Sequence, residues 1–533
     1  MAEEAQTYDY IVIGAGSAGC VVAGRLGEAG RKVLLLEAGG PDSSPWIHIP
    51  MGYAKLYNNP RINWCYQSEP EPHLNGRSLF QPRGKVLGGT GSINGMIYMR
   101  GQPADFDLWR DNGCAGWGFD DVLPFFKMSE HQERGPSKFH GTGGPVWVSD
   151  LPSKHPIAEA FHESSVRLGS RRNDDFNGET QLGTGYVQVT TRRGRRWSTA
   201  SGYLRGEAKS RINVVTRALA EKILVENGRA VGVSYRLGGA KREARAAAEV
   251  VLCGGTYNSP QILQISGIGP ASAARDLGVD PVVDLPGVGM NLQDHFGVGL
   301  EFKSSRPYTV NDLANSLFAR SFAMARYVLF RSGPMASNGN YSNTFLSTTG
   351  DDARPDMMIT FMAWCTTEDL QPRKFSGFTI LAEHIRPDAR GTVMARTANP
   401  EDAPAILFNF LASDYDRKAA LAGLKHSRLI SRTEPMKSYC EKEITPGPEK
   451  ASDEDLLEHC RNGGLSLLHP VGTCKMGVDD DAVVDARLRV RGIEGLRVVD
   501  ASIMPSIVSG NTNAATIMIG EKGAHMMIED SRA

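Results

Sequence analysis

The sequence lacks an excess of either charge, paired cysteines and long apolar runs, and each absence narrows what the chain can be. Its 59 lysines and arginines balance 60 aspartates and glutamates, which leaves a formal net charge of -1. Without a strong overall field, the chain has no global attraction for nucleic acid or for an anionic membrane surface. We therefore expect a small, weakly charged molecule as its partner and no nucleic acid.

The cysteines are scattered along the chain. They show neither a Cys-x-x-Cys pair nor zinc-like His/Cys spacing, so we predict reduced thiols and no metal site. The eight positions are Cys20, Cys65, Cys114, Cys253, Cys365, Cys440, Cys460 and Cys474.

No stretch of the sequence is long and apolar enough to span a bilayer. The first residues, MAEEAQT, are acidic and polar and lack the basic and apolar regions of a secretory signal. We therefore expect a cytoplasmic protein without a transmembrane segment, and leave peripheral attachment to a membrane open. Its 533 residues, 41% of them apolar, can bury a large core and indicate two or more domains.

The N-terminal region carries a nucleotide-binding pattern. The apolar run YIVI at residues 10–13 predicts a buried parallel strand, and GAGSAG at 14–19 turns the chain into a helix. Small glycines let backbone N–H groups approach a pyrophosphate at the start of that helix. A second apolar run, 33–36, ends at Glu37, where a carboxylate would accept from ribose hydroxyls. The unit predicts FAD or NAD without deciding between them, and Glu37 argues against the 2′-phosphate of NADP.

A glycine-dense loop follows at residues 82–96, PRGKVLGGTGSINGM. Glycines allow such a loop to wrap closely around a planar or phosphorylated ligand, because no Cβ holds the backbone away. The stretch resembles the first signature of the glucose–methanol–choline (GMC) oxidoreductase family. It departs from that signature at Thr90-Gly91-Ser92, where family members often carry two or three serines.

Further motifs in the family's order extend the resemblance from about residue 8 to about residue 528. The second signature is complete at 255–269, and shorter family-typical motifs follow it. They are LPGVGMNLQDH at 285–295, LLHPVGTCKMG at 467–477 and VVDAS at 498–502. Within the family the chain is most similar to the bacterial choline-dehydrogenase-like branch, judged by residues 175–178, 195–198 and 509–513.

The resemblance implies an α/β fold, α+β overall, in which a Rossmann-like FAD-binding domain is interleaved with a cap over the flavin. Residues 1–160, 210–300 and 462–533 would form the FAD-binding domain. Residues 161–209 and 301–461 would form the substrate-binding cap, built on an antiparallel sheet with helices.

The resemblance also implies which residues surround FAD. Matching motifs place seven residues on its ADP half and one beside the adenine: Gly14, Gly16, Ser17, Ala18, Gly19, Glu37 and Ala38, and Ala220. The flavin side and the isoalloxazine end would contact Thr90, Gly91, Asn94, Gly95, Asp500, Ala501, Asn511 and Thr512. Some members link FAD covalently through a histidine just before the asparagine of the first signature. That position is Ile93 here, so we expect noncovalent FAD.

Two residues match the family's catalytic positions. His469 stands at the position of the catalytic base, and Asn511 at a position held by a second histidine or an asparagine. An alcohol loses its hydroxyl proton while hydride leaves for flavin N5, and a neutral imidazole can accept that proton near physiological pH. An amide N–H can donate to the developing alkoxide without competing for the proton.

Simpler roles compete at three places. Asn511 precedes the apolar run 514–519 and could cap a helix there. His295 follows Asp294, but neighbours in sequence need not form a dyad in space, and a scaffold role is favoured. The basic run 192–196 is interpreted as a solvated turn.

The resemblance implies FAD-dependent oxidation of a primary alcohol to the aldehyde, with oxygen, a quinone or another carrier as electron acceptor. A hydroxynitrile-lyase-like activity, in which FAD is only structural, is the alternative. A NAD-dependent enzyme is disfavoured by the complete second signature at 255–269. The particular alcohol, the acceptor and the oligomeric state are not readable from the sequence.

Overall fold

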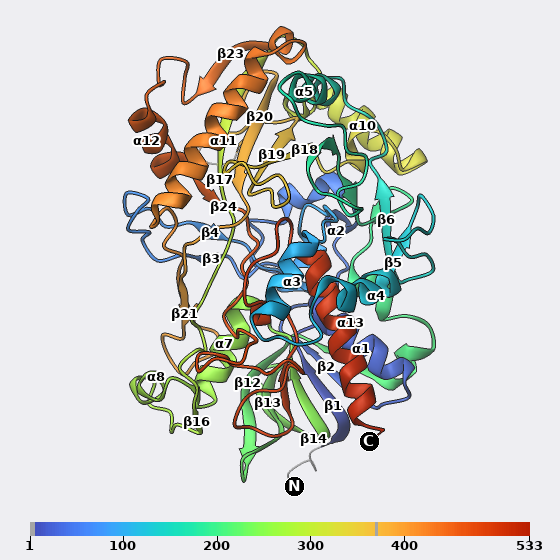
Figure 1. The fold of residues 1–533 in the computed structure, drawn as a ribbon. Helices are drawn as coiled ribbons and strands as arrows, with labels where there is room; N and C mark the ends of the chain where they lie inside the picture. Colours follow the sequence, from blue (N-terminus) through green and yellow to red (C-terminus); the bar gives the residue numbers. More distant parts are fainter. Residues whose placement is uncertain (1–5, 368–370, 533) are drawn as a thin grey trace.

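The computed structural model describes residues 6–367 and 371–532. Two large β-sheets dominate the fold, one at each end of the molecule in Figure 1. Both chain ends lie beside the lower sheet in that view, so the polypeptide leaves this sheet to build the upper one and returns to it.

The lower sheet has seven strands in the order β11-β2-β1-β14-β13-β12, with β25 paired to β14. Strands β11, β2, β1, β14 and β25 run parallel, while β12, β13 and β14 form an antiparallel meander. The bounds are β1 (Thr7–Ile13), β2 (Val33–Glu37), β11 (Ile212–Thr216), β12 (Ala218–Glu226), β13 (Arg229–Leu237), β14 (Ala240–Leu252) and β25 (Leu496–Val498).

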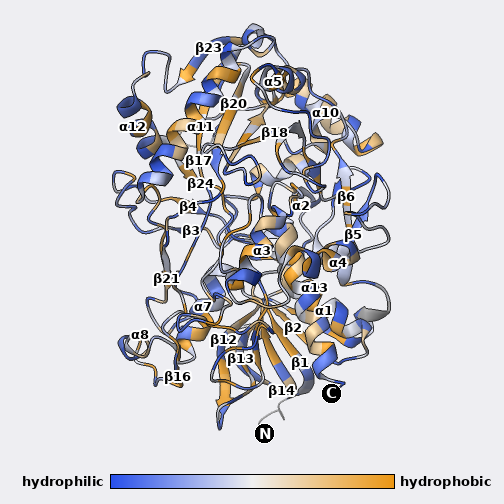
Figure 2. Ribbon diagram, in the orientation of Figure 1, coloured by the Kyte–Doolittle hydropathy of each residue, from blue (hydrophilic) through white to orange (hydrophobic). Residues whose placement is uncertain are grey.

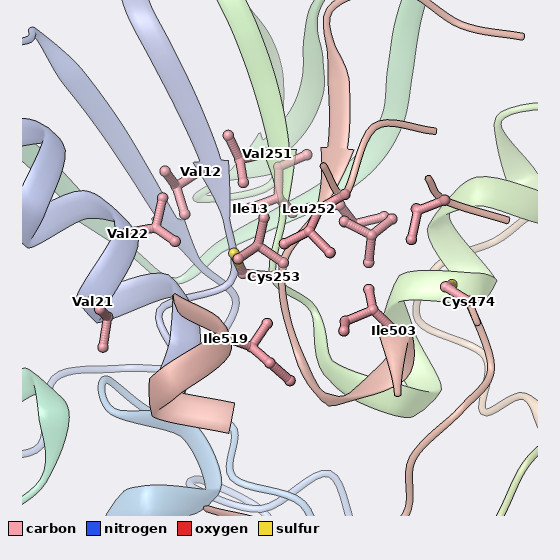
Figure 3. Close-up of a cluster of buried hydrophobic side chains, with 14 of the residues drawn as sticks. Val12, Ile13, Val21, Val22, Val251, Leu252, Cys253, Cys474, Ile503 and Ile519 are labelled. Atoms are coloured by element: carbon pink, nitrogen blue, oxygen red, sulfur yellow. The ribbon is translucent and has the colours of Figure 1, made fainter. Parts of the chain in front are cut away.

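The central parallel strands β1 and β2 are mostly apolar and buried because helices cover them. Every residue of β2 is buried, as expected for a strand with both faces inside the protein. Helices α1 (Ser17–Glu28) and α13 (Asn513–Asp530) pack on one another beside the sheet, and α4 (Phe119–Ser129) packs on α13. Figure 3 shows side chains of β1, β14, α1 and α13 meeting in this core, among them Ile13, Leu252 and Ile519. Each such side chain stabilises the fold by about 1.5–3 kcal/mol.

The turn between β1 and α1 requires glycine. Gly14 has a φ of +97°, and a Cβ on it would lie 2.4 Å from the carbonyl oxygen of Cys253. A Cβ on Gly19 would lie 1.9 Å from the carbonyl oxygen of Gly14. The two glycines therefore let the start of α1 approach the ends of β1 and β14, where parallel strands present their carboxyl ends.

The upper sheet also has seven strands, in the order β23-β17-β20-β19-β18-β7, with β24 paired to β17. All of its pairings are antiparallel. The bounds are β7 (Gly183–Tyr186), β17 (Phe296–Ser304), β18 (Asn340–Leu346), β19 (Met357–Met362), β20 (Gly377–His384), β23 (Cys440–Thr445) and β24 (Leu465–Ser466).

One face of the upper sheet is covered by helices α5 (Pro156–Arg167) and α11 (Asp414–Arg432). Because side chains alternate along a strand, Met357, Ile359 and Phe361 of β19 enter the core on one face. The alternate residues of the strand, Met358, Thr360 and Met362, line a cavity on the other face. Packing in that core therefore accounts for only one of the two faces of this methionine-rich strand.

Shorter elements surround the two sheets. The helices are α2 (Pro45–His48), α3 (Pro103–Asp111), α6 (Thr199–Tyr203), α7 (Gly255–Ile265), α8 (Ala271–Asp276), α9 (Val310–Asn315), α10 (Leu317–Phe330) and α12 (Asp453–Gly463). The strands are β3 (Tyr66–Gln67), β4 (Phe80–Gln81), β5 (Glu130–Gln132), β6 (Val146–Asp150), β8 (Gln188–Val189), β9 (Thr191–Arg192), β10 (Arg195–Arg196), β15 (Ile268–Gly269), β16 (Val283–Asp284), β21 (Thr392–Met394) and β22 (Ala405–Leu407). Among the helices of the described residues, none is both long and apolar enough to cross a bilayer.

Candidate active site

A cavity of about 920 Å³ is lined by residues of both sheets. At one end it meets the turn between β1 and α1, and at the other the open face of β18, β19 and β20. Its size suits a dinucleotide or a large cofactor together with a small substrate.

The predicted nucleotide residues lie at the lower-sheet end. Gly14, Gly16, Ser17, Ala18, Glu37, Ala38 and Ala220 all line the cavity. The space beside Gly16 is open, with nothing within 4 Å of a Cβ built there, so the N-terminus of α1 faces an accessible volume. Gly19 is not in the lining, because its surface is used by the contact with the Gly14 carbonyl.

Glu37 is held where the sequence pattern predicts a ribose-binding carboxylate. Its two oxygens accept from the backbone N–H groups of Ala15, at 3.0 Å, and Gly39, at 2.8 Å. Burial raises the pKa of Glu37 to about 7, against the lowering effect of these two hydrogen bonds. Its orientation is thus fixed by the backbone on both sides of the β1–α1 turn.

Seven of the eight residues predicted for the flavin end lie at the cavity wall. The lining contains Thr90, Asn94, Gly95, Asp500, Ala501, Asn511 and Thr512. Gly91 is outside the lining, and its carbonyl oxygen instead accepts from Arg196 at 3.2 Å. Asp500 accepts from the backbone N–H of Gly255 and the hydroxyl of Ser259, which fixes the start of α7 against the C-terminal motif.

The side chain of Arg196 holds the glycine-dense loop in place through hydrogen bonds. Its guanidinium is buried and donates to the side-chain oxygen of Asn94 at 2.8 Å and to the Asn94 carbonyl at 2.6 Å. The interpretation of residues 192–196 as a solvated turn is therefore wrong for Arg196. A basic run gives no indication of which arginine turns inward, because that depends on the distant loop it contacts.

His469 and Asn511 meet at the cavity wall. The amide nitrogen of Asn511 lies 2.9 Å from Nε2 of His469, and Nδ1 of His469 lies 3.1 Å from Nδ1 of His295. An amide nitrogen only donates, so Nε2 of His469 accepts and its proton resides on Nδ1, pointing to His295. The ring thus turns a lone pair toward Asn511 and the cavity.

Asp294 and His295 fix this ring. Asp294 accepts from the backbone N–H of His469 at 2.8 Å, and its other oxygen accepts from the hydroxyl of Ser466. His295 is fully buried and contacts the far side of the ring. The sequence favoured a scaffold role for His295, and the structure adds a direct contact with the predicted base that sequence position could not reveal.

The surroundings keep His469 neutral. Its ring is deep in the molecule with one edge open to the cavity, and burial lowers its pKa to about 3, with the charge of Arg83 contributing. Arg83 donates to the carbonyl of Leu468 at 2.8 Å, which places that charge next to the ring's own backbone. An imidazole in this position is unprotonated at physiological pH and can accept a proton.

Asn511 does not cap the helix that follows it. Helix α13 begins at Asn513 with Thr512 as its N-cap, and no side chain makes a capping hydrogen bond there. The side-chain oxygen of Asn511 is buried and has no hydrogen-bond partner among the described residues. An unsatisfied acceptor at the cavity wall fits a bound group that carries a donor.

The cap side of the cavity combines apolar and polar side chains with one buried acid. Its wall includes Trp364, Thr379, Leu381 and Glu383. Glu383 is buried, and its carboxyl accepts a hydrogen bond from Thr360. Burial raises the pKa of Glu383 to about 8, so the group is largely uncharged near neutral pH.

Two family models, both described as GMC oxidoreductase, match residues 8–297 and 387–520. The chain belongs to the GMC oxidoreductase family. It is 40% identical over 530 residues to an alcohol dehydrogenase (acceptor) from Pseudomonas putida, and the alignment covers 98% of this chain and 96% of that protein. It is 41% identical over 520 residues to an oxygen-dependent choline dehydrogenase from Sinorhizobium fredii, which spans 97% of this chain and 94% of that protein.

Solved structures agree with this membership. Pyridoxine 4-oxidase from Mesorbium loti has a TM-score of 0.88 at 29% identity, covering 97% of this chain and 98% of its own. An FAD-dependent oxidoreductase from Chaetomium thermophilum has a TM-score of 0.89 at 25% identity, covering 98% and 100%. The family, the mixed α/β fold and the oxidoreductase class expected from the sequence are confirmed, and FAD is supported as the cofactor.

Proposed function

We propose that this GMC oxidoreductase oxidises a primary alcohol to the aldehyde, with His469 as the base that takes the hydroxyl proton. The observation that carries the proposal is the arrangement of His469 and Asn511 at the cavity wall, 2.9 Å apart, with a neutral imidazole. Relatives described as an alcohol dehydrogenase and a choline dehydrogenase support the substrate class.

The chain's own residues would divide the work as follows. Nε2 of His469 accepts the hydroxyl proton, and the amide N–H of Asn511 donates to the oxygen as negative charge develops there. His295 and Asp294 hold the imidazole in orientation during this transfer. FAD, when bound, supplies the acceptor for the hydride that leaves the alcohol carbon. Oxygen, a quinone or another carrier would later reoxidise the enzyme.

The proposed division of the chain follows the two sheets except at β24 and the start of β17, which belong to the upper sheet but lie within the ranges assigned to FAD. Residues 1–160, 210–300 and 462–533 would hold FAD, and residues 161–209 and 301–461 would form the cap. The parallel strands β1, β2 and β14 and the Glu37 carboxylate support the first assignment. The open face of β19 and β20 at the cavity supports the second.

Anaerobic mixing with a panel of alcohols tests the activity. We expect the yellow absorbance of the purified protein to bleach with at least one of short alkyl, aryl, furanic, polyol or quaternary-ammonium alcohols. Readmission of air then reports whether oxygen restores the colour. Cleavage of a cyanohydrin without any bleaching would instead favour the hydroxynitrile-lyase-like alternative, and a colourless protein would contradict both.

We further propose that FAD is held without a covalent bond to the protein. Ile93 lines the cavity at the position where some family members carry the linking histidine, and its side chain has no nucleophile. Precipitation with acid should therefore leave the yellow cofactor in the supernatant. A yellow pellet, with a flavin-sized mass increment on a peptide of the protein, would contradict this expectation.

A further inference from the structure

Helix α10 carries the largest concentration of exposed apolar side chains among the described residues. Six of its fourteen residues are large, apolar and mostly solvent-exposed, and Phe318 reaches 83% exposure. They are Leu317, Phe318, Phe322, Val328, Leu329 and Phe330. Exposed apolar residues gathered on one element mark an interaction site more often than chance, whereas single ones need no explanation.

The helix is nevertheless fixed to the body of the protein. Ala323 and Tyr327 are buried against Met335 and Ala336, and the Tyr327 hydroxyl donates to the carbonyl of Gly194 at 3.0 Å. In Figure 2, α10 lies at the outer edge of the molecule with hydrophobic and hydrophilic turns side by side. Its exposed side is therefore a defined surface on a docked helix.

The charges on α10 and on the segment that follows it have one sign. Between Asp312 and Asp351 the sequence has no acidic residue, while Arg320, Arg326 and Arg331 lie on or directly after the helix and are exposed. Arg326 donates to the hydroxyl of Ser332 and Arg331 lies over the Tyr327 ring, and none of the three arginines forms an ion pair with a carboxylate in the part of the chain that the structure describes.

A second basic segment adjoins the end of α10. A Cβ on Gly194 would lie 2.2 Å from the carbonyl oxygen of Arg331, so the 193–195 turn touches the helix terminus. Arg193 and Arg195 are exposed there. The six apolar residues and these five arginines together are called the docking face below.

We propose that the docking face attaches this enzyme peripherally to an anionic phospholipid bilayer. An amphipathic helix with aromatic and aliphatic side chains and several arginines can insert its apolar side chains at the headgroup boundary while the guanidinium groups bind phosphates. The overall charge of -1 does not oppose this, because such attraction acts locally within a Debye length.

Charge selects the bilayer over a second copy of the chain. A two-fold contact through α10 would bring the same arginines of both copies together without any acidic residue between Asp312 and Asp351 to neutralise them. An anionic lipid surface supplies the missing charges. Self-association through this face is therefore the outcome that the experiment must distinguish.

The docking face is connected to the cavity wall through a short path. The 3-10 helix Pro334–Ala336 follows α10, and the Asn338 amide then donates to the carbonyl of Gly95 at 2.6 Å. Asn340 and Gly95 both line the cavity. A bound bilayer would thus lie on the side of the molecule where the upper sheet meets the glycine-dense loop.

Flotation with vesicles tests the proposal on the FAD-loaded full chain. We expect the protein to float with vesicles of phosphatidylcholine containing phosphatidylglycerol, less with phosphatidylcholine alone, and less as salt is added. The triple variant Phe318→Ser, Phe322→Ser, Leu329→Ser should lose binding by at least about tenfold. The variant Arg320→Gln, Arg326→Gln should lose the preference for anionic lipid while keeping residual binding.

Matched substitutions elsewhere provide the control. Leu429 and Val478 are also exposed, at 52% and 67%, but lie on other parts of the molecule. Leu429→Ser with Val478→Ser should float like the wild type, and FAD content and Tm should verify folding of every variant. The proposal is overturned if the wild type stays with the unbound protein at all lipid compositions, or if the triple variant floats equally well. It is also overturned if that variant only converts a dimer to a monomer.

Discussion

Replacement of His469 by alanine is expected to slow anaerobic bleaching of the flavin by about 10²- to 10⁴-fold, the contribution typical of a general base. Nε2 of this residue carries the lone pair that faces Asn511 at 2.9 Å, and no other described side chain hydrogen-bonds to that nitrogen. Stopped-flow measurement under saturating alcohol isolates the reductive step from any later reaction with an acceptor.

The control for His469→Ala is cofactor content. His469 lines the cavity but is not one of the residues expected to hold the ADP half of FAD, so FAD should remain bound in the variant at the wild-type ratio. His469→Gln keeps a similar volume and a hydrogen-bonding group but no proton acceptor of comparable basicity, and it should be equally slow. Near-normal bleaching in either variant would refute the assignment of His469 as base.

Replacement of Asn511 by alanine is expected to slow bleaching less, by about 10- to 150-fold, which corresponds to the loss of one hydrogen bond to a developing charge. The amide of Asn511 contacts His469 and makes no capping bond to α13. Tm should therefore change little. A variant with wild-type kinetics and a lowered Tm would show that Asn511 has only a structural role.

Asn511→Asp separates charge from hydrogen bonding. A carboxylate beside Nε2 favours the protonated imidazole and raises the pKa of His469 from its low value. Below the raised pKa the ring is protonated and cannot accept the hydroxyl proton, so the rate should fall at low pH and recover as pH rises. In the wild type, burial holds the pKa of His469 at about 3, so the rate should not fall through protonation of this ring between pH 6 and 8. A pH-independent Asn511→Asp variant would contradict the proposed contact.

Much of the fold follows from short segments of the sequence. The strand, glycine turn, strand and acid of residues 10–37 form one contiguous segment, and their spacing alone identifies them. Gly19 and Gly91 lie outside the cavity lining, where Gly19 packs on the Gly14 carbonyl and the Gly91 carbonyl accepts from Arg196, so their contact with FAD stays a prediction. A glycine in such a pattern indicates that another group lies close to the backbone, but it does not indicate whether that group is a cofactor or another part of the protein.

The rest of the site depends on contacts between distant segments. His295 and His469 are 174 positions apart and meet only because β17 and β24 pair, with Phe296 opposite Ser466. Arg196 turns inward because the loop at Asn94 presents acceptors to it. Glu383 could be recognised as a cavity residue only after the register of β20 against β19 was known.

Side chains on β19 point alternately to the core and to the cavity, and this alternation separates thermal stability from the shape of the cavity. Met357, Ile359 and Phe361 contribute to the core, so substitutions there should change thermal stability. Met358, Thr360 and Met362 line the cavity and are not part of that core cluster. Substitutions on the cavity face of β19 can therefore change the shape of the cavity, while the residues on the opposite face keep the strand packed in the core.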